Sequence, residues 1–181
     1  QAFAVMLRSP HAHARIKHID SSAALAAPGA LAVLTGADVQ ADGLTTITHN
    51  PLHSSPPDVA VVNLDGSPIP LPPHYILPED KARIVGEPVA MVIADTLAQA
   101  KDAAELVAVD YEVLPSATGT VDAARADAPK VWDDLKNNVC IDAEIGDSKA
   151  ADAAFDGAPH VVRVSTTLSR VNPCTLKRRC R

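Results

Sequence analysis

The sequence predicts a domain built from both β-strands and helices, and three stretches carry this prediction. Residues 2–7 place every second apolar side chain on one side of an extended strand. Residues 89–94 are apolar at every position, so a strand here needs cover on both of its faces. Apolar residues then recur at helical spacing over 97–107, and an alternating stretch follows over 107–113. The order strand, helix, strand is therefore the central unit of the expected fold, and parallel strands in it would need a right-handed crossover.

The bulk composition limits the class of protein. The chain has 181 residues, which suits one domain or one domain with a long arm. Hydrophobic residues make up 47% of the sequence and aromatic residues only 3%, so the core must consist of aliphatic side chains. The net charge of −6 at pH 7 argues against a nucleic-acid-binding protein and against adhesion to an anionic membrane. No apolar run is long enough to predict a membrane-spanning helix.

The start of the chain and its cysteines bear on where the protein works. The chain opens with Gln1 instead of Met and runs at once into a strand-like stretch, which favours a fragment of a longer polypeptide. The lack of a signal peptide in such a fragment therefore indicates little about location. Its three cysteines, Cys140, Cys174 and Cys180, form no CxxC pair. A disulfide framework is therefore not expected, and a reducing compartment such as the cytoplasm is favoured.

Short strands and one short helix are expected before residue 40. A second strand should end at Ile19, where Asp20 or Ser21 can cap a helix that the Pro-Gly pair at 28–29 ends. Residues 30–36 then read as another strand because they are almost entirely apolar.

Residues 44–80 form a long Pro-rich arm. Eight of the fifteen prolines lie between Pro51 and Pro78. Because proline has no backbone donor, the arm cannot be an internal strand or a long helix. We expect an extended surface segment, which either shapes a substrate entrance or an interface, or is a poorly ordered insertion.

The central unit spans about residues 84–113. Its first strand should start at Arg83 to Val85 and be interrupted by a bulge or kink at Gly86-Glu87-Pro88. Asp95 or Thr96 is suited to cap the helix that follows.

The rest of the chain shows weaker signals. Thr120 can cap a short helix through Ala124, and 126–145 looks irregular, with Trp132 as its packing anchor. Asp147 or Ser148 can cap another helix.

That helix should end near 155–157, and the alternation of Val162, Val164 and Leu168 predicts a final strand.

Histidines are the first candidates for a metal site. His11 and His13 would present both imidazoles on one face if their segment were extended. Zinc needs three or four ligands, and His49 and His53 in the arm complete no cluster with ligand spacing. Surface or turn histidines therefore explain the pattern better.

Carboxylates are the candidates for acid–base chemistry. Glu87 could act as a general base only if it were buried with a substrate proton within reach, and a hydrogen-bonded or solvated residue is the simpler interpretation. Glu79 and Asp80 should form an exposed acidic pair, and Asp110 and Glu112 should share the solvated face of their strand.

The sequence lacks the known motifs for a catalytic nucleophile and for phosphate binding. It contains no GxSxG, GxxxxGK[ST] or GxGxxG motif. Cys140 has no base nearby in sequence, and Cys174 with Cys180 are too few for an iron–sulfur cluster. The basic run at 177–179 could touch an acidic partner but is more simply a solvated terminus. We therefore assign no catalytic, cofactor-binding or metal-ligating residue to this chain.

Four segments carry a family resemblance when they are taken in order: RSPHAHARIKHID, APGALAVLTGAD, DKARIVGEPVAMVIADTLAQAKDAAELVAVDYEVLP, and GD followed by AFDGAPHVV. This ordered set resembles the amino-terminal α/β-hammerhead domain of the molybdopterin-binding large subunit of molybdenum hydroxylases. Xanthine dehydrogenase, aldehyde oxidase and aerobic carbon monoxide dehydrogenase belong to that family. The resemblance covers Phe3 to Pro173, and its most specific part is DKARIVGEPVA followed by VDYEVLP.

The resemblance implies an α+β fold with a mixed sheet and a redox parent enzyme. Such a parent hydroxylates an aldehyde, a purine or another N-heterocycle, or oxidises carbon monoxide. Its molybdenum is carried by molybdopterin, often as the cytosine dinucleotide, and electrons leave through [2Fe-2S] clusters and FAD on partner subunits or domains. The family's catalytic glutamate and pterin-binding segments lie beyond the hammerhead, so no cofactor is expected on this fragment and Glu87 takes no catalytic role.

The last ten residues depart from the family pattern. Family members continue with Asn-Pro-x-x-Leu-Glu-Pro-Arg, and Asn172, Pro173 and Leu176 match, but the basic run 177–179 stands where Glu-Pro-Arg is expected. We expect a hammerhead domain over 1–171, with the arm inserted. Residues 172–181 would be an aberrant or truncated start of the molybdenum-binding domain, through truncation, a frameshift or a divergent split subunit.

Two functional hypotheses follow from the sequence. The first is a structural domain, inactive by itself, that packs against the molybdenum-binding domain of the same large subunit and against the FAD and iron–sulfur subunits. The alternative is a free-standing protein–protein interaction module without redox function. A small hydrolase is disfavoured because no nucleophile–base pair is present.

Overall fold

The computed structural model describes residues 1–47, 62–117, 119–166 and 168. Two units make up the chain, Gln1–Ala143 and Glu144–Arg181. The strands of the described residues are β1 (Phe3–Arg8), β2 (Ala14–Asp20), β3 (Ala30–Thr35), β4 (Lys81–Ala82), β5 (Pro88–Ala94) and β6 (Ala108–Val113). The helices are α1 (Ser22–Leu25), α2 (Gly36–Ala41), α3 (Leu97–Glu105), α4 (Thr120–Ala123) and α5 (Ser148–Asp156).

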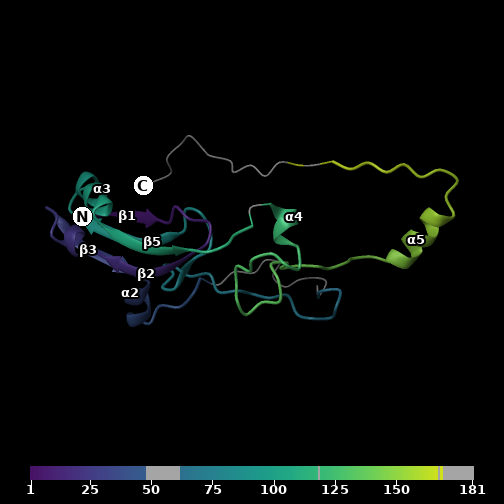
Figure 1. The fold of residues 1–181 in the computed structure, drawn as a ribbon, viewed down its shortest axis with the longest axis horizontal. Coiled ribbons are helices and arrows are strands. Elements are labelled where there is room, and N and C mark those ends of the chain that lie inside the picture. The colour runs from purple at the N-terminus through teal and green to yellow at the C-terminus, as the bar shows by residue number, and fades with distance from the viewer. Residues whose placement is uncertain (48–61, 118, 167, 169–181) are drawn as a thin grey trace. The chain divides into compact units, whose positions relative to one another are not determined.

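The strands form two three-stranded sheets (Figure 1). The first sheet has the order β1-β5-β3 and the second sheet the order β4-β2-β6. Every strand pair in the described residues is antiparallel. The α+β class is therefore confirmed, but the mixed sheet is wrong. The reason is that β1 and β3 already pair with both edges of β5, so β6 pairs with β2 instead and α3 joins two different sheets.

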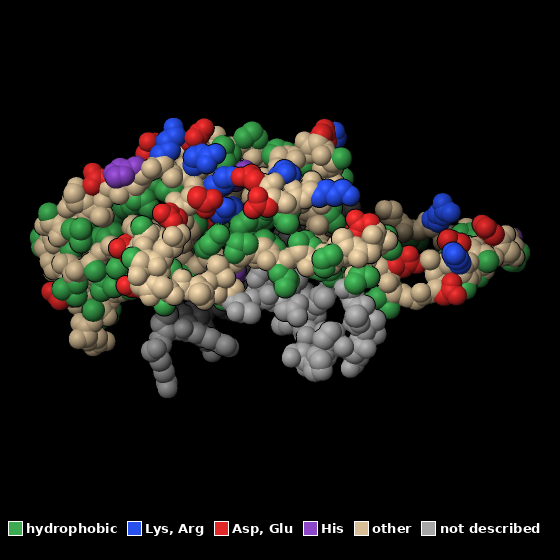
Figure 2. Space-filling view, turned by 90° about the horizontal axis from the view of Figure 1, so that it is seen from below, with side chains coloured by type: hydrophobic (Ala, Val, Ile, Leu, Met, Phe, Trp, Pro, Cys, Tyr) green, Lys and Arg blue, Asp and Glu red, His purple; other side chains and the backbone are tan. Residues whose placement is uncertain are grey.

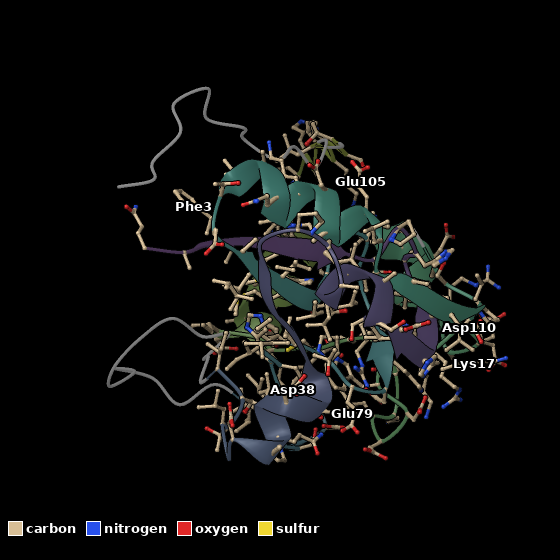
Figure 3. All side chains as sticks on the ribbon, turned by 90° about the vertical axis from the view of Figure 1, so that its left-hand side faces the viewer. Phe3, Lys17, Asp38, Glu79, Glu105 and Asp110 are labelled. Carbon is tan, nitrogen blue, oxygen red and sulfur yellow. The ribbon has the colours of Figure 1, made fainter. Side chains whose placement is uncertain are left out.

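One face of the first sheet is covered by helices. Val92 in β5 is fully buried and packs with Ala103, Ala104 and Val107, which belong to α3 and the residues that follow it. Figure 3 shows α3 lying across this sheet, with Glu105 on its outer side. The helix begins where Thr96 accepts a hydrogen bond from the backbone N–H of Gln99 at 3.2 Å, as an N-cap residue does. The predicted strand over 89–94 and the predicted helix after it are confirmed.

The other face of the first sheet has no such cover among the described residues. In an antiparallel pair, directly opposite residues share a face. The register places Met91 opposite both Met6 and Leu34, and Ile93 opposite both Ala4 and Ala32. Met6 is 41% exposed, and Met91 and Ile93 are only half-buried. The described residues thus cover only one face of β5, and the cover that the sequence requires for the second face is not supplied by this part of the chain. We call these six residues the open face.

A second apolar cluster joins the two sheets. Val89 is fully buried and packs with Ile16 of β2 and Ala82 of β4. It lies where the register of β1 and β5 shifts, because Leu7 is paired with Ala90 but the next residue is paired with Pro88. This bulge leaves Val89 without a cross-strand partner and free to fill the space between the sheets.

The stretch before β5 is a turn and not the expected strand with a bulge. Residues 84–86 form a bend and a turn, and Gly86 has φ +84°, a conformation that residues other than glycine rarely adopt. The backbone of Ser9 makes two hydrogen bonds to this turn. Its N–H donates to the Glu87 carbonyl at 2.9 Å, and its carbonyl accepts from the Gly86 N–H at 2.8 Å. The glycine thus lies in a turn between β4 and β5, and this turn is hydrogen-bonded to Ser9 just after β1.

Helix α2 was not predicted from the sequence. Its start is a capping box, because Asp38 accepts from the Thr35 N–H at 2.7 Å and from the Thr35 hydroxyl at 2.8 Å. These two hydrogen bonds lower the pKa of Asp38. Gly36 fits closely against Pro78, since a Cβ at residue 36 would lie 2.8 Å from the Pro78 carbonyl. The helix is therefore packed tightly on the end of the arm.

The short helices α1 and α4 and the second unit match the sequence in part. Helices occur after Asp20 and from Thr120, as predicted, although Gly119 is the N-cap of α4. Asp147 caps α5 by accepting from the Ala150 N–H at 2.9 Å, which confirms that helix. The final strand over 162–168 is wrong for the residues described there: Val162, Val164 and Leu168 are more than four-fifths exposed, and no strand pairs with them.

No helix in the described residues is both long enough and apolar enough to span a bilayer.

Candidate functional site

Polar and aromatic side chains meet around strand β4. We call this group the β4 clamp; it consists of Tyr75, Lys81, Arg83, Trp132 and Asp133. Its members come from the end of the arm, from β4 and from the irregular segment near residue 132. The antiparallel pairing of Ala82 with Ala14 holds β4 on the second sheet, and so fixes the position of its neighbours.

Lys81 and Asp133 form the ion pair of the clamp. The lysine side chain is only 6% exposed, whereas that of the aspartate is 71% exposed. The hydrogen bond and the charge of Lys81 lower the pKa of Asp133, with smaller effects from His13 and Lys130. Loss of the ion pair would cost more free energy at the buried lysine than at the exposed aspartate, because a buried cation without a partner has also lost its hydration. The carboxylate thus neutralises a lysine that the fold has buried.

Arg83 lies between two aromatic rings. Its guanidinium carbon is 4.1 Å from the centre of the Trp132 ring and 5.7 Å from that of Tyr75. The same guanidinium donates to Asp80 at 2.9 Å and to the Lys81 carbonyl at 3.1 Å. A planar cation that stacks and donates at once suits arginine and not lysine. Arg83 therefore ties the arm and the segment of Trp132 to β4.

Glu87 belongs to the same neighbourhood as a structural residue. Its carboxylate accepts from the Arg83 backbone N–H at 2.5 Å and closes the turn that precedes β5. The side chain is thus engaged within the turn, in agreement with its interpretation as a hydrogen-bonded residue.

The two amino-terminal histidines make separate contacts. The chain bends over residues 10–13 instead of running extended. The ring of His11 packs edge-on against Tyr111, with 5.0 Å between ring centres. His13 is buried, and its Nδ1 lies 2.9 Å from the Pro115 carbonyl, while its Nε2 has no hydrogen-bond partner. Burial raises the pKa of Tyr111. The structure does not bring the two imidazoles together on one face as an extended segment would.

The remaining candidate residues are dispersed. Glu79 and Asp80 are both exposed, as expected; Glu79 accepts from the side chain of Gln40, and Asp80 pairs with Arg83. Glu112 lies 3.5 Å from the Arg15 side chain across the second sheet. Figure 3 shows Asp110 projecting outward at the edge of that sheet.

Only some of the cysteines and remaining histidines lie in the described residues. The Cys140 thiol lies 3.7 Å from the Pro70 carbonyl. His49, His53, Cys174, Cys180 and the basic run 177–179 lie outside the described residues. Within the described ranges, no three His, Cys, Asp or Glu side chains are grouped as metal ligands.

The arm is packed against the irregular segment over residues 130–142. Leu64 donates its N–H to the Asp142 carbonyl at 2.7 Å, and Asp142 donates its own N–H to the Asn63 side chain at 3.0 Å. Between the two segments lies an apolar hollow of about 230 Å³ lined by Pro70, Pro72, Val131, Trp132, Leu135 and Val139, among others. The part of the arm over residues 62–80 is therefore an integral part of the first unit.

These residues do not fit a molybdopterin. A pterin phosphate needs accessible donors, but Lys81 is paired with Asp133 and the terminal nitrogens of Arg83 donate to Asp80 and to the Lys81 carbonyl. The Arg83 Nε has no hydrogen-bond partner, but it is buried. The hollow beside Trp132 offers mainly carbon atoms. The β4 clamp thus holds three segments of the chain together. It could not be recognised in the sequence, because its two groups of residues are about fifty residues apart.

A family model described as "Aldehyde oxidase and xanthine dehydrogenase, a/b hammerhead domain" matches residues 1–115. The chain belongs to this family. The resemblance stated from the ordered segments is thereby confirmed. The matched range contains all strands of both sheets, β4 included, and the helix α3 that connects the two sheets.

Known relatives agree with this assignment of the hammerhead domain. The carbon monoxide dehydrogenase large chain of Afipia carboxidovorans is 35% identical over 187 residues, covering 97% of this chain and 21% of the relative. The crystal structure of the Cu,Mo-CO dehydrogenase in its carbon monoxide reduced state is similar with a TM-score of 0.67 and 33% identity, over 88% of this chain and 19% of that chain. The aldehyde oxidoreductase of Desulfovibrio gigas is similar with a TM-score of 0.57 and 32% identity, over 74% and 13%.

The hammerhead domain is a small share of these proteins. The chain spans about a fifth of the length of the carbon monoxide dehydrogenase large chain. It corresponds to one domain of molybdenum hydroxylase large subunits.

Proposed function

We propose that this chain serves as a structural domain of a molybdenum-dependent oxidoreductase and that the chemistry takes place on polypeptide outside it. The family match over residues 1–115 is the observation that carries this proposal. The geometry of the β4 clamp supports it, because Lys81, the most buried cation among the described residues, and the stacked Arg83 both hold segments together.

The parent reaction and its cofactors form the finer part of the proposal. Hydroxylation of an aldehyde, a purine or another N-heterocycle, or oxidation of carbon monoxide, is the proposed reaction class. The molybdenum would be carried by molybdopterin, as the cytosine dinucleotide, and FAD and [2Fe-2S] clusters would lie on partner subunits or domains. The relatives named as Cu,Mo-CO dehydrogenase and as aldehyde oxidoreductase support this class.

The proposed partners are other parts of a hydroxylase complex in the cytoplasm. They are the molybdenum-binding domain of the same large subunit and the FAD and iron–sulfur subunits. Nucleic acid is not among them: the net charge is −6, and on the face in Figure 2 acidic and basic side chains are interspersed and do not form a basic patch. We further propose that the hammerhead domain extends over 1–171 and that 172–181 begins the next domain.

The test has two arms. The purified chain should contain no molybdenum by elemental analysis and show no flavin or cluster absorbance. A chimera in which this chain replaces the matching fifth of the Afipia carbon monoxide dehydrogenase large chain should assemble with its partner subunits and contain molybdenum.

Two results would contradict the proposal. One is molybdenum, pterin or turnover in the purified chain, which would place the chemistry within it. The other is a chimera that fails to assemble although the relative's own large chain assembles in parallel, which would favour a free-standing interaction module.

A further inference from the structure

The open face is apolar across all three strands of the first sheet. One row is formed by Met6, Met91 and Leu34, which are opposite one another. The next row is formed by Ala4, Ile93 and Ala32. No charged side chain interrupts either row.

The two faces of β5 differ in cover but not in composition. Val92 and Ala94 on the covered face are fully buried, whereas Met91 and Ile93 on the open face are half-buried. A strand that only had to meet water on one face would alternate apolar and polar residues. The apolar residues at both open-face positions are those of a strand that is buried on both sides.

Both methionines of the chain are on the open face. The sequence contains only two, Met6 and Met91, and the register places them opposite each other. Methionine is flexible and polarisable, and it is over-represented on surfaces that adapt to an apolar partner. The open face therefore fits a protein surface and not a charged ligand.

The length of the relatives indicates what lies on this face. The carbon monoxide dehydrogenase large chain matches 97% of this chain, and this match accounts for only 21% of the relative. Almost four-fifths of such a subunit is thus polypeptide covalently joined to the hammerhead, at a high effective concentration beside it.

We propose that the open face is the surface on which the remaining part of the molybdenum hydroxylase large subunit packs. This inference rests on the proposed function and adds the residues that make the contact. The partner segment is apolar and packs across Met6, Met91 and Ile93. α3 occupies the opposite face of the same sheet, so the sheet becomes the central layer of three.

The test places a charge on each side of the sheet in the chimeric enzyme. Met6→Lys lies on the open face, and Leu97→Lys on α3 is the matched control, because the two side chains are 41% and 42% exposed. Met6→Lys should reduce the yield of assembled, molybdenum-containing enzyme at least tenfold, since an unpaired charge would be buried. Leu97→Lys should leave it within twofold. In the chain alone, circular dichroism should show both variants folded with Tm values within a few degrees of the parent.

The outcomes separate this inference from the proposed function. Equal assembly of Met6→Lys and Leu97→Lys would overturn the open face as an interface while the proposed function stood. Equal failure of both variants would also overturn it, because the effect would not be specific to the face. A chimera that does not assemble even without substitutions would overturn both.

A second copy of the chain is the alternative occupant. Sedimentation analysis of the chain alone should show a monomer. A dimer that Met6→Lys dissociates would assign the open face to self-association and overturn the inference.

Discussion

The two faces of the first sheet share one strand and one kind of side chain, but only one face is finished within this chain. On the covered face, Val92 is fully buried against Ala103 and Ala104 of α3. On the open face, Met91 is half-buried between Met6 and Leu34. An apolar residue in β5 therefore indicates a site that is to be buried. Which of the two faces is buried within this chain depends on where α3 packs.

Substitutions at Val92 and Met91 give the strongest test of the difference between the two faces. Val92→Ala should lower the free energy of unfolding by about 2 kcal/mol, because it removes fully buried carbon atoms and leaves a cavity beside α3. Met91→Ala removes more atoms, yet it should cost less than half as much in the same chain, because water already reaches that side chain. Urea unfolding of the purified chain measures both values.

Equal costs at the two positions would mean that the open face is as well packed as the covered face. That result would contradict the comparison.

The cap of α3 sharpens the comparison with a smaller effect. Thr96→Ala removes the hydroxyl that accepts from the Gln99 N–H, and should lower the free energy of unfolding by about 1 kcal/mol. Thr96→Ser keeps the acceptor and should stay within a few tenths of a kcal/mol of the parent. The effect should appear in urea unfolding, because α3 covers the buried face; no difference between Ala and Ser would show that α3 begins without this cap.

The smallest expected effect concerns the β4 clamp, which lies outside both faces. The pKa of Asp133 is lowered from 3.8 by its contact with Lys81, so the ion pair stabilises the fold above that value and is lost as pH falls through the folded pKa. Because Asp133 is 71% exposed, water screens the pair, and Asp133→Asn should lower Tm at pH 7 by about one degree.

The pH dependence is the control for this prediction. The Tm difference between Asp133→Asn and the parent should shrink as pH falls from 5 to 3, measured by differential scanning fluorimetry. A difference that stays constant over this range would mean that the carboxylate charge plays no part in the effect.

Local patterns predicted most of the first unit's elements but not their partners. The apolar run 89–94 and the cap at Thr96 sufficed to predict β5 and α3, because burial and capping act within a few residues. Pairing was not predicted: the sequence indicated the order strand, helix, strand and left open whether its two strands pair, whereas β1 and β3 take both edges of β5. Helix α2 was missed although Thr35 and Asp38 have the spacing of a capping box, because a strongly apolar strand ends immediately before it.

The clamp could not be predicted because its energy comes from contacts between distant residues. Arg83 and Trp132 each stand in a stretch without periodicity, and nothing local indicates that one stacks on the other. Trp132 was expected to anchor packing, and the structure gives it that role. Val162 and Val164 show the opposite error, since alternation alone predicted a strand that has no neighbour in the described residues.

The stacking of Arg83 on Trp132 has a practical consequence for spectroscopy. The chain contains a single tryptophan, and it lies beside β4 and not in the aliphatic core. Intrinsic indole emission will therefore report release of the arm from the second sheet, while far-ultraviolet circular dichroism reports loss of the strands and α3. Transitions that differ between the two signals would reveal that the clamp opens before the core unfolds.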